Sequence, residues 1–280
     1  MRARSQAFSS ALRRMPERLH YCLHGDPASA PALMLIHPLG AALDFWDDCL
    51  PTWTPAYSVL ALDLRSAGHS PRGTAPGLGQ HVADLEFLRA ALGLDTVVPV
   101  ACAVGGMVAA AYAARHPHRV TALVLANPTP RSAEPARAML TARAEAVRQD
   151  GMAAILPGAV ERPFERQPRD ARYARYLAAF AAQDPGAYAE AVLGFATADA
   201  SADLARVRCP TLLVAGRHDL LLPIHHAAAT RALLPSGTRL EIDEEGAHFL
   251  PYQRPAAFAA RVLAFLGQAA GRPGPVRQDG

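Results

Sequence analysis

Two side chains in the C-terminal third of the sequence are suited to moving a proton. Asp219 stands three residues after the apolar run at 210–216, and His248 lies in the segment Glu245–Leu250. A carboxylate that orients an imidazole and fixes its tautomer creates a general base for water or for an acidic C–H or O–H group. Asp219 also stands at the end of an expected strand, where α/β proteins build their sites. An aspartate and a histidine that a fold brings together would do acid–base chemistry on a small-molecule substrate.

Short apolar runs alternate with helical patterns along most of the chain. This alternation predicts an α/β fold with a mostly parallel, doubly wound sheet, because parallel strands need crossover helices. The runs are apolar throughout because helices cover both faces of such a sheet. Helical spacing occurs at 81–92, 104–115 and 256–266. The six expected strands lie at 32–37, 58–64, 96–101, 120–126, 210–216 and 238–243.

Residues 131–203 interrupt this alternation. The segment is rich in alanine, shows helical patterns without a clear strand, and contains several prolines. We therefore expect a helical cap inserted between core strands, with the α/β core at 19–130 and 204–267. Outside the core, the sequence predicts a basic N-terminal arm at 1–18 and a disordered, Pro/Gly-rich tail at 268–280.

The strand expected at 96–101 runs into the tight turn Ala101–Gly106 and then into a helix. This arrangement resembles the nucleophile elbow of the α/β-hydrolase superfamily, in which small residues flank a nucleophile between a strand and a helix. With Ala103 at the apex, the crowded positions two before and two after it are Ala101 and Gly105, which suit the turn. The motif leads one to expect serine at the apex, and this sequence has alanine.

Cys102 is the alternative nucleophile. If it stood at the apex, the crowded positions would be Val100 and Val104, whose β-branched side chains do not suit the turn. We therefore expect Cys102 to be a structural thiol packed beneath the turn. A thiolate activated by the helix N-terminus stays open as the other interpretation.

The resemblance to the superfamily covers about residues 20–267, and the motifs occur in the family's order. His37–Gly40 stands where the family carries His-Gly-x-Gly, and the wider segment is similar to the branch that contains the 3-oxoadipate enol-lactonases. The resemblance implies an oxyanion hole formed by the backbone N–H groups of Leu39 and Val104. Pro38 has no N–H, but the implied hole does not need one there.

The resemblance also implies that Asp219 is the triad acid and that His248 is the catalytic histidine. Asn127 occupies the other position where such folds keep the acid, after the strand at 120–126, so Asp219 is the better candidate. A loop or helix-cap aspartate is the alternative for Asp219.

The other histidines divide into two groups. His37 in the oxyanion loop and His218 beside Asp219 are expected near the pocket, together with Cys102. No metal-ligand cluster, phosphate-binding loop or dinucleotide fingerprint occurs in the sequence, so we expect no metal and no cofactor. The histidines expected at the surface are His116, His118, His225 and His226.

Alanine at position 103 cannot store an acyl group, because it has no lone pair to attack with. The expected dyad and oxyanion hole then predict an enzyme acting on a small activated carbonyl compound, such as an enol-lactone, an ester or a β-dicarbonyl. Hydrolysis or a cofactor-independent lyase, isomerase or oxygenase step would suit them. Two alternatives stay open: a catalytically silent fold that binds a small molecule or a protein, and a serine hydrolase whose serine was replaced by Ala103.

The composition excludes nucleic acid as the main partner. With 280 residues, 51% of them hydrophobic, the chain is long and apolar enough for a large buried core. Its net charge of +3 is concentrated in residues 1–18, which contain five arginines and one glutamate. Nine arginines and nine acidic residues between 131 and 200 leave the cap neutral, so it predicts a small, partly hydrophobic ligand without a charge preference.

The sequence also favours a cytoplasmic location. The N-terminal segment lacks a continuous apolar stretch, so we expect no secretory signal. The uncharged segment Val97–Ala114 contains Pro99 and two glycines, which favours a buried strand and helix over a membrane span. Four cysteines without a CxxC pair predict buried free thiols in a reducing compartment. We therefore expect no membrane partner, and the oligomeric state stays open.

Overall fold

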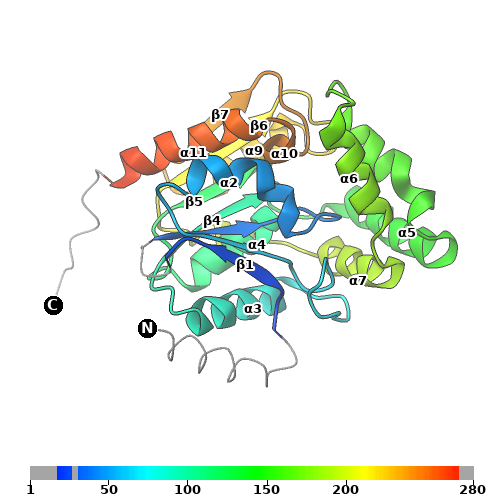
Figure 1. The fold of residues 1–280 in the computed structure, drawn as a ribbon, viewed down its shortest axis with the longest axis horizontal. Coiled ribbons are helices and arrows are strands. Elements are labelled where there is room, and N and C mark those ends of the chain that lie inside the picture. Colours follow the sequence, from blue (N-terminus) through cyan, green and yellow to red (C-terminus); the bar gives the residue numbers. More distant parts are fainter. Residues whose placement is uncertain (1–17, 27–30, 271–280) are drawn as a thin grey trace.

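A seven-stranded sheet forms the centre of the computed structural model, which describes residues 18–26 and 31–270 (Figure 1). The strand order is β1-β3-β2-β4-β5-β6-β7; β1 pairs antiparallel with β3, and the other pairings are parallel. The expected mostly parallel α/β sheet is confirmed. The strands are β1 (Tyr21–His24), β2 (Ala32–Ile36), β3 (Val59–Leu62), β4 (Val97–Cys102), β5 (Leu123–Ala126), β6 (Thr211–Gly216) and β7 (Arg239–Asp243).

Strand β1 is an addition to the six expected strands. It is a four-residue edge strand with no fully buried side chain, so it lacks the apolar run that marks the other strands. Cys22 lies on this strand and is exposed, while Cys49 and Cys102 are buried and Cys209 is half-buried. All four cysteines are free thiols, but the expectation that all are buried is wrong for Cys22 because an edge strand has no neighbour to cover it.

Helices cover both faces of the sheet. Successive residues of a strand point to opposite sides, so each strand contributes side chains to both cores. Leu33 packs in one core cluster with Trp46, whereas Met34 packs in another with Leu85 and Val108. The first face is covered by η1 (Leu43–Cys49), α2 (Leu50–Trp53), α10 (Leu250–Gln253) and α11 (Pro255–Ala270). The second face is covered by α3 (Leu78–Ala91), α4 (Gly105–Arg115), α8 (Ser201–Leu204) and α9 (Ile224–Leu233).

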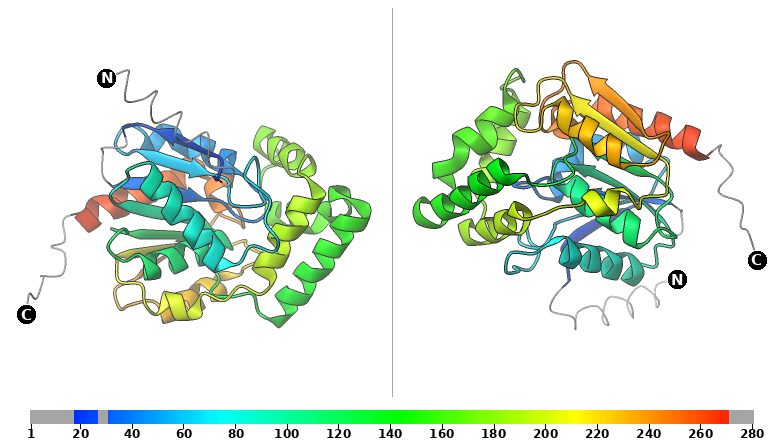
Figure 2. Two further views of the ribbon diagram at one scale, coloured as in Figure 1. Left: turned by 90° about the horizontal axis from the view of Figure 1, so that it is seen from below. Right: turned by 180° about the vertical axis from the view of Figure 1, so that it is seen from behind.

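The segment between β5 and β6 forms a helical cap over the edge of the sheet where the strands end (Figures 1 and 2). Its two ends are held together by backbone hydrogen bonds from Ser132 N to Ala198 O and from Ala200 N to Pro130 O, both 2.9 Å. Helices α5 and α7 pack against each other. The cap elements are α5 (Glu134–Asp150), η2 (Met152–Ile155), η3 (Pro157–Glu161), η4 (Arg162–Phe164), α6 (Ala171–Ala181) and α7 (Pro185–Ala196).

The ends of the chain differ in part from expectation. Helix α11 continues to Ala270, so the core extends three residues past the expected boundary at 267. The arm expected at 1–18 lies outside the described residues except for Arg18, and so does the tail from 271 onward. Among the described helices, none is both long and apolar enough to cross a membrane.

Candidate active site

An aspartate and a histidine meet at the carboxyl edge of the sheet. His248, in the loop after β7, places its Nδ1 3.0 and 2.9 Å from the two carboxylate oxygens of Asp219, in the loop after β6. Both side chains are buried. A carboxylate can only accept, so Nδ1 is the protonated nitrogen and the lone pair of Nε2 is left free. The pair therefore has the geometry of an oriented general base.

The environment of Asp219 keeps its carboxylate ionised. Burial by itself raises the pKa of Asp219, but the His248 imidazole and the N–H groups of Leu221 and Leu222 outweigh it, so the pKa lies below its ordinary value. Both N–H groups donate to Asp219 Oδ1 at 2.8 Å. The loop after β6 thus holds the acceptor side of the pair in one orientation.

Asn127 ties together the loops that present this pair. Its amide Nδ2 donates to the carbonyl oxygens of Ala247 and His248, both at 2.7 Å, and its Oδ1 accepts from Gly216 N at 2.7 Å. The residue sits directly after β5 with a φ of +44°. From the sequence, Asn127 was notable only because it stands where some such folds keep the triad acid. The sequence signal for its bridging role was that Asn127 is a polar residue directly after a buried strand, where neighbouring strand ends lie side by side.

The turn after β4 is strained at Ala103, whose φ is +49°. An L-residue in this left-handed region costs roughly 1–2 kcal/mol, so the surrounding contacts must enforce the conformation. Ala103 N donates to Ala126 O at 2.9 Å, and a Cβ at Gly105 would lie 2.6 Å from His37 O. Only glycine fits at that second position. The methyl group of Ala103 is thereby held at the apex, beside the base of a cavity.

Cys102 does not reach this cavity. Its side chain is fully buried beneath the turn, with Sγ 3.8 Å from the carbonyl oxygen of His248. Burial raises the pKa of the Cys102 thiol well above its ordinary value, so the reactive thiolate is disfavoured. The structural thiol is the interpretation that fits, and the expected place of Cys102 in the pocket is wrong.

A cavity of about 560 Å³ lies between the cap and this edge of the sheet. Leu39, Ala103, Val104 and His248 line its core side. Within the part of the chain that the structure describes, the backbone N–H groups of Leu39 and Val104 donate to no protein acceptor. The cavity therefore brings a free imidazole nitrogen together with two free N–H groups.

His37 orients one of these N–H groups from outside the cavity. Its Nδ1 lies 2.8 Å from Pro38 O, and its Nε2 accepts from Leu64 N at 2.9 Å. In a trans peptide the N–H points opposite to the C=O, so holding Pro38 O turns the N–H of Leu39 the other way. Burial lowers the pKa of His37, which keeps it neutral for this role. The expectation that His37 lines the main pocket is wrong, because both ring nitrogens are occupied by the backbone.

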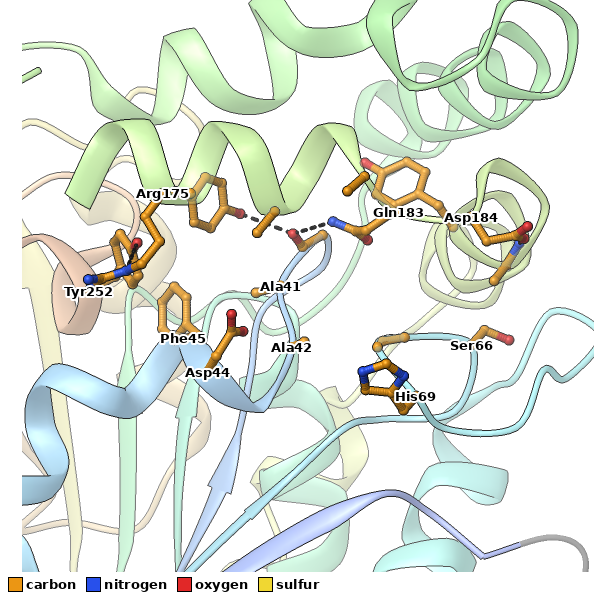
Figure 3. A pocket seen from close by; sticks show the side chains of 18 residues that line it. Ala41, Ala42, Asp44, Phe45, Ser66, His69, Arg175, Gln183, Asp184 and Tyr252 are labelled. Atoms are coloured by element: carbon orange, nitrogen blue, oxygen red, sulfur yellow. Dashed lines mark hydrogen bonds between the residues drawn. The ribbon is translucent and has the colours of Figure 1, made fainter. Parts of the chain in front are cut away.

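The cap also holds this loop, through the carbonyl oxygen of Gly40. Gln183 Nε2 donates to Gly40 O at 2.9 Å and Tyr176 Oη does so at 3.4 Å, as the dashed lines in Figure 3 show. Figure 3 also shows a second cavity beyond this loop, of about 240 Å³. Its polar side chains include Asp44, His69 and Arg175.

The remaining histidines differ in how they lie relative to the cavities. His218 is half-buried and lines neither cavity; its backbone N–H donates to Gly246 O at 2.9 Å. His225 is exposed, as expected, and His226 is half-buried; both also line the large cavity from the start of α9. His226 Nδ1 lies 3.1 Å from Thr129 Oγ1. Their position after the Asp219 loop was the available signal. Among the described residues, no cluster of three or more His, Cys, Asp or Glu side chains could hold a metal ion.

Comparison with known proteins finds relatives that share the α/β-hydrolase fold or are named as hydrolases. A family model described as alpha/beta hydrolase fold matches residues 31–151. The chain is 30% identical over 270 residues to a protein of Caulobacter sp. (strain K31) named "Putative carbamate hydrolase RutD", covering 90% of this chain and 97% of that protein. The enol-lactonase from Burkholderia xenovorans LB400 superposes with a TM-score of 0.82 at 26% identity, covering 89% of this chain and 96% of its own. A hydrolase from Pseudomonas aeruginosa PA01 gives 0.81 at 30% identity, covering 89% and 94%.

Proposed function

This chain belongs to the α/β-hydrolase family and is a hydrolase-like enzyme, and from this premise we propose that it acts on a small activated carbonyl compound with Asp219 and His248 as a general-base dyad. One observation carries the proposal. The free Nε2 of His248 and the free N–H groups of Leu39 and Val104 line one cavity, while a buried, ionised carboxylate holds the other ring nitrogen.

A hydrolytic cycle without a covalent intermediate follows from these groups. His248 takes a proton from water, and the resulting hydroxide adds to the substrate carbonyl carbon. The N–H groups of Leu39 and Val104 stabilise the oxyanion that forms. When the tetrahedral intermediate collapses, the bond to the leaving group breaks and the leaving group takes the proton back from His248.

Because residue 103 is alanine, the proposed cycle has no acyl-enzyme step. It stands where the family's motif carries its nucleophile, and its methyl group cannot form an acyl-enzyme. Water is a weaker nucleophile than a serine activated in place, so the substrate must be activated by a good leaving group. The name of one relative, an enol-lactonase, supports this class of substrate, because an enol-lactone releases a stabilised enolate.

Steady-state kinetics on activated esters, enol-lactones, carbamates and β-dicarbonyls test the proposal. We expect turnover by the wild-type protein and a fall in kcat of about 10²–10⁴-fold for His248→Ala, the usual range for a general base. His69→Ala is the matched control, because His69 is an exposed histidine that lines only the second cavity. Its kcat should stay within about two-fold of wild type.

Three results would contradict the proposal. Unchanged turnover in His248→Ala would show that Asp219 and His248 are not the general-base dyad. Tight binding of a panel compound without turnover would favour a binding protein. If Ala103→Ser is labelled by a serine-directed phosphonate and far exceeds the wild type in esterase activity, the chain is a serine hydrolase with a replaced nucleophile.

A further inference from the structure

The charged side chains that line the large cavity are all cationic. They are three arginines of the cap segment, Arg131, Arg143 and Arg162; among the residues that the structure describes, no aspartate or glutamate lines the cavity. The cap is neutral as a whole because its acidic residues lie elsewhere; Glu190, for example, pairs with Arg148 at 2.9 Å. The lining of the cavity therefore carries charge information that the neutral cap as a whole does not. Net charge counts residues and does not show which side of a helix they occupy.

Arg143 differs from the other arginines of α5. Arg137 and Arg148 pair with Glu134 and Glu190. Among the described residues, no carboxylate lies within 4.0 Å of the half-buried Arg143; its side-chain contacts are Met139 Sδ, at 3.6 Å, and the hydroxyl of Tyr188. A guanidinium stays charged at all physiological pH values, so a carboxylate brought beside it gains a charge-assisted, bidentate contact. This position is suited to an anion supplied from outside the chain.

Tyr188 completes this side of the cavity. The residue is 2% exposed and lines the cavity next to Arg143. Burial raises the pKa of Tyr188, and the neighbouring Arg143 guanidinium acts in the opposite direction. The hydroxyl is therefore protonated and available as a donor beside the guanidinium. A planar carboxylate matches this combination, because a guanidinium binds its two oxygens in a bidentate manner.

We propose that the substrate carries a carboxylate, which Arg143 binds on the cap side of the cavity with the help of Tyr188. The inference rests on the proposed function, because it places the reacting carbonyl at the opposite, core side, next to His248 and the N–H groups of Leu39 and Val104. Apolar side chains lie between the two polar sides; they include Leu140, Phe180 and Phe249. The substrate class is thus a small acyl compound with a short apolar spacer between its carbonyl and its carboxylate.

A matched pair of substrates tests this assignment. Mono-4-nitrophenyl glutarate carries a carboxylate, and 4-nitrophenyl butyrate has the same activated ester without one. We expect the wild-type protein to prefer the glutarate ester in kcat/KM by about 10- to 100-fold, the value of a charged hydrogen-bonded contact. Arg143→Gln should remove that preference, mainly through a raised KM for the glutarate ester.

Arg137→Gln is the control, because Arg137 lies on the same helix, pairs with Glu134 and does not line the large cavity. It should keep the wild-type preference. Equal losses on both esters in Arg143→Gln, or equal kcat/KM values for both esters in the wild type, would overturn the inference.

A binding measurement separates the failure of this inference from the failure of the proposed function. Calorimetric titration with glutarate needs no turnover, and we expect binding by the wild type and by His248→Ala, with about 10-fold or greater loss in Arg143→Gln. If no ester is turned over but this pattern holds, the proposed function fails and the carboxylate site stands. If glutarate does not bind the wild type, the carboxylate site is wrong whatever the kinetics show.

Discussion

Two cavities lie under the same cap, share Tyr188, and adjoin the same loop after β2, yet their polar groups are arranged in different ways. In the second cavity most charges already have partners within the protein. Arg175 pairs with Asp48 at 2.8 Å, and Asp184 caps helix α7 by accepting from Ala187 N at 2.6 Å. A ligand there would have to compete with contacts that the protein already makes.

In the large cavity some polar groups are paired, such as His226 with Thr129 and Arg162 with Leu220 O, but several others have no such partners. His248 Nε2 and the N–H groups of Leu39 and Val104 are free on the core side, and Arg143 has no carboxylate beside it on the cap side. Leaving buried polar groups unpaired costs free energy, so their concentration in one place indicates a site that a ligand completes. The comparison teaches that unpaired polar groups, and not the presence of a hollow, distinguish the cavity that we propose as the active site.

The largest expected difference between the cavities comes from removing one carboxylate in each. Asp219→Asn replaces an acceptor-only group with an amide, which no longer favours the Nδ1–H tautomer of His248, so we expect kcat to fall by about 10²–10⁴-fold. Asp44→Asn removes an exposed carboxylate that lines the second cavity, and kcat should stay within about two-fold. Steady-state kinetics on the best substrate of the panel measure both. Comparable losses in the two variants would end the distinction between the cavities.

The difference in unfolding free energy between the wild type and Asp219→Asn has an expected pH dependence. The folded-state pKa of Asp219 lies below its ordinary value, so folding favours the ionised form. Its contribution to the free energy of unfolding is then full above the unfolded pKa of about 3.9 and is lost as the pH falls through the folded-state value. Urea unfolding should show a constant gap between wild type and Asp219→Asn from pH 8 to about 5 and a narrowing gap below about pH 4. A gap that widens in acid would contradict this sign.

An intermediate effect is expected at the wall between the cavities. Gln183 lines the second cavity, but its hydrogen bond to Gly40 O restrains the loop that carries Leu39 N–H. Gln183→Met keeps the length of the side chain and removes the donor, at a cost of about 1 kcal/mol. We expect kcat to fall by about 3- to 10-fold with little change in KM, because the oxyanion hole acts on the transition state.

Tyr176→Phe provides the graded comparison, since its bond to the same oxygen is longer, at 3.4 Å. It should reduce kcat less than Gln183→Met does. Equal changes in KM and kcat, together with a lowered melting temperature, would show that Gln183 has only a structural role.

The fold could be predicted from the sequence because strands that are covered by helices on both faces are continuously apolar. Strand β1 carries no such run and was not expected. Asp219 and His248 could be paired in advance because each occupies the position that the family resemblance implies for the triad acid and the catalytic histidine. Strand ends share one edge of a parallel sheet, and the two side chains lie 2.9 Å apart.

The cap side of the site was not readable in the same way. Arg143 and Arg137 are both exposed or half-exposed arginines of one helix, and the sequence does not show which of them faces the cavity. That distinction arises only when the cap docks on the core. For the same reason the sequence did not show that His225 and His226 line the cavity, which residues of the cap close.

The smallest expected effect comes from filling the second cavity. Ala187 on α7 lines only that cavity, and Ala136 on α5 lines only the large one; both are half-buried helical alanines. Ala187→Leu should leave kcat/KM within about two-fold on both the glutarate and the butyrate esters. Ala136→Leu adds the same volume where the substrate is expected to bind, so KM should rise by roughly 3- to 10-fold, the cost of about 1 kcal/mol of overpacking. If Ala187→Leu lowers turnover as much as Ala136→Leu, substrate passes through or occupies both cavities, and the loop that separates them is a partition within one site.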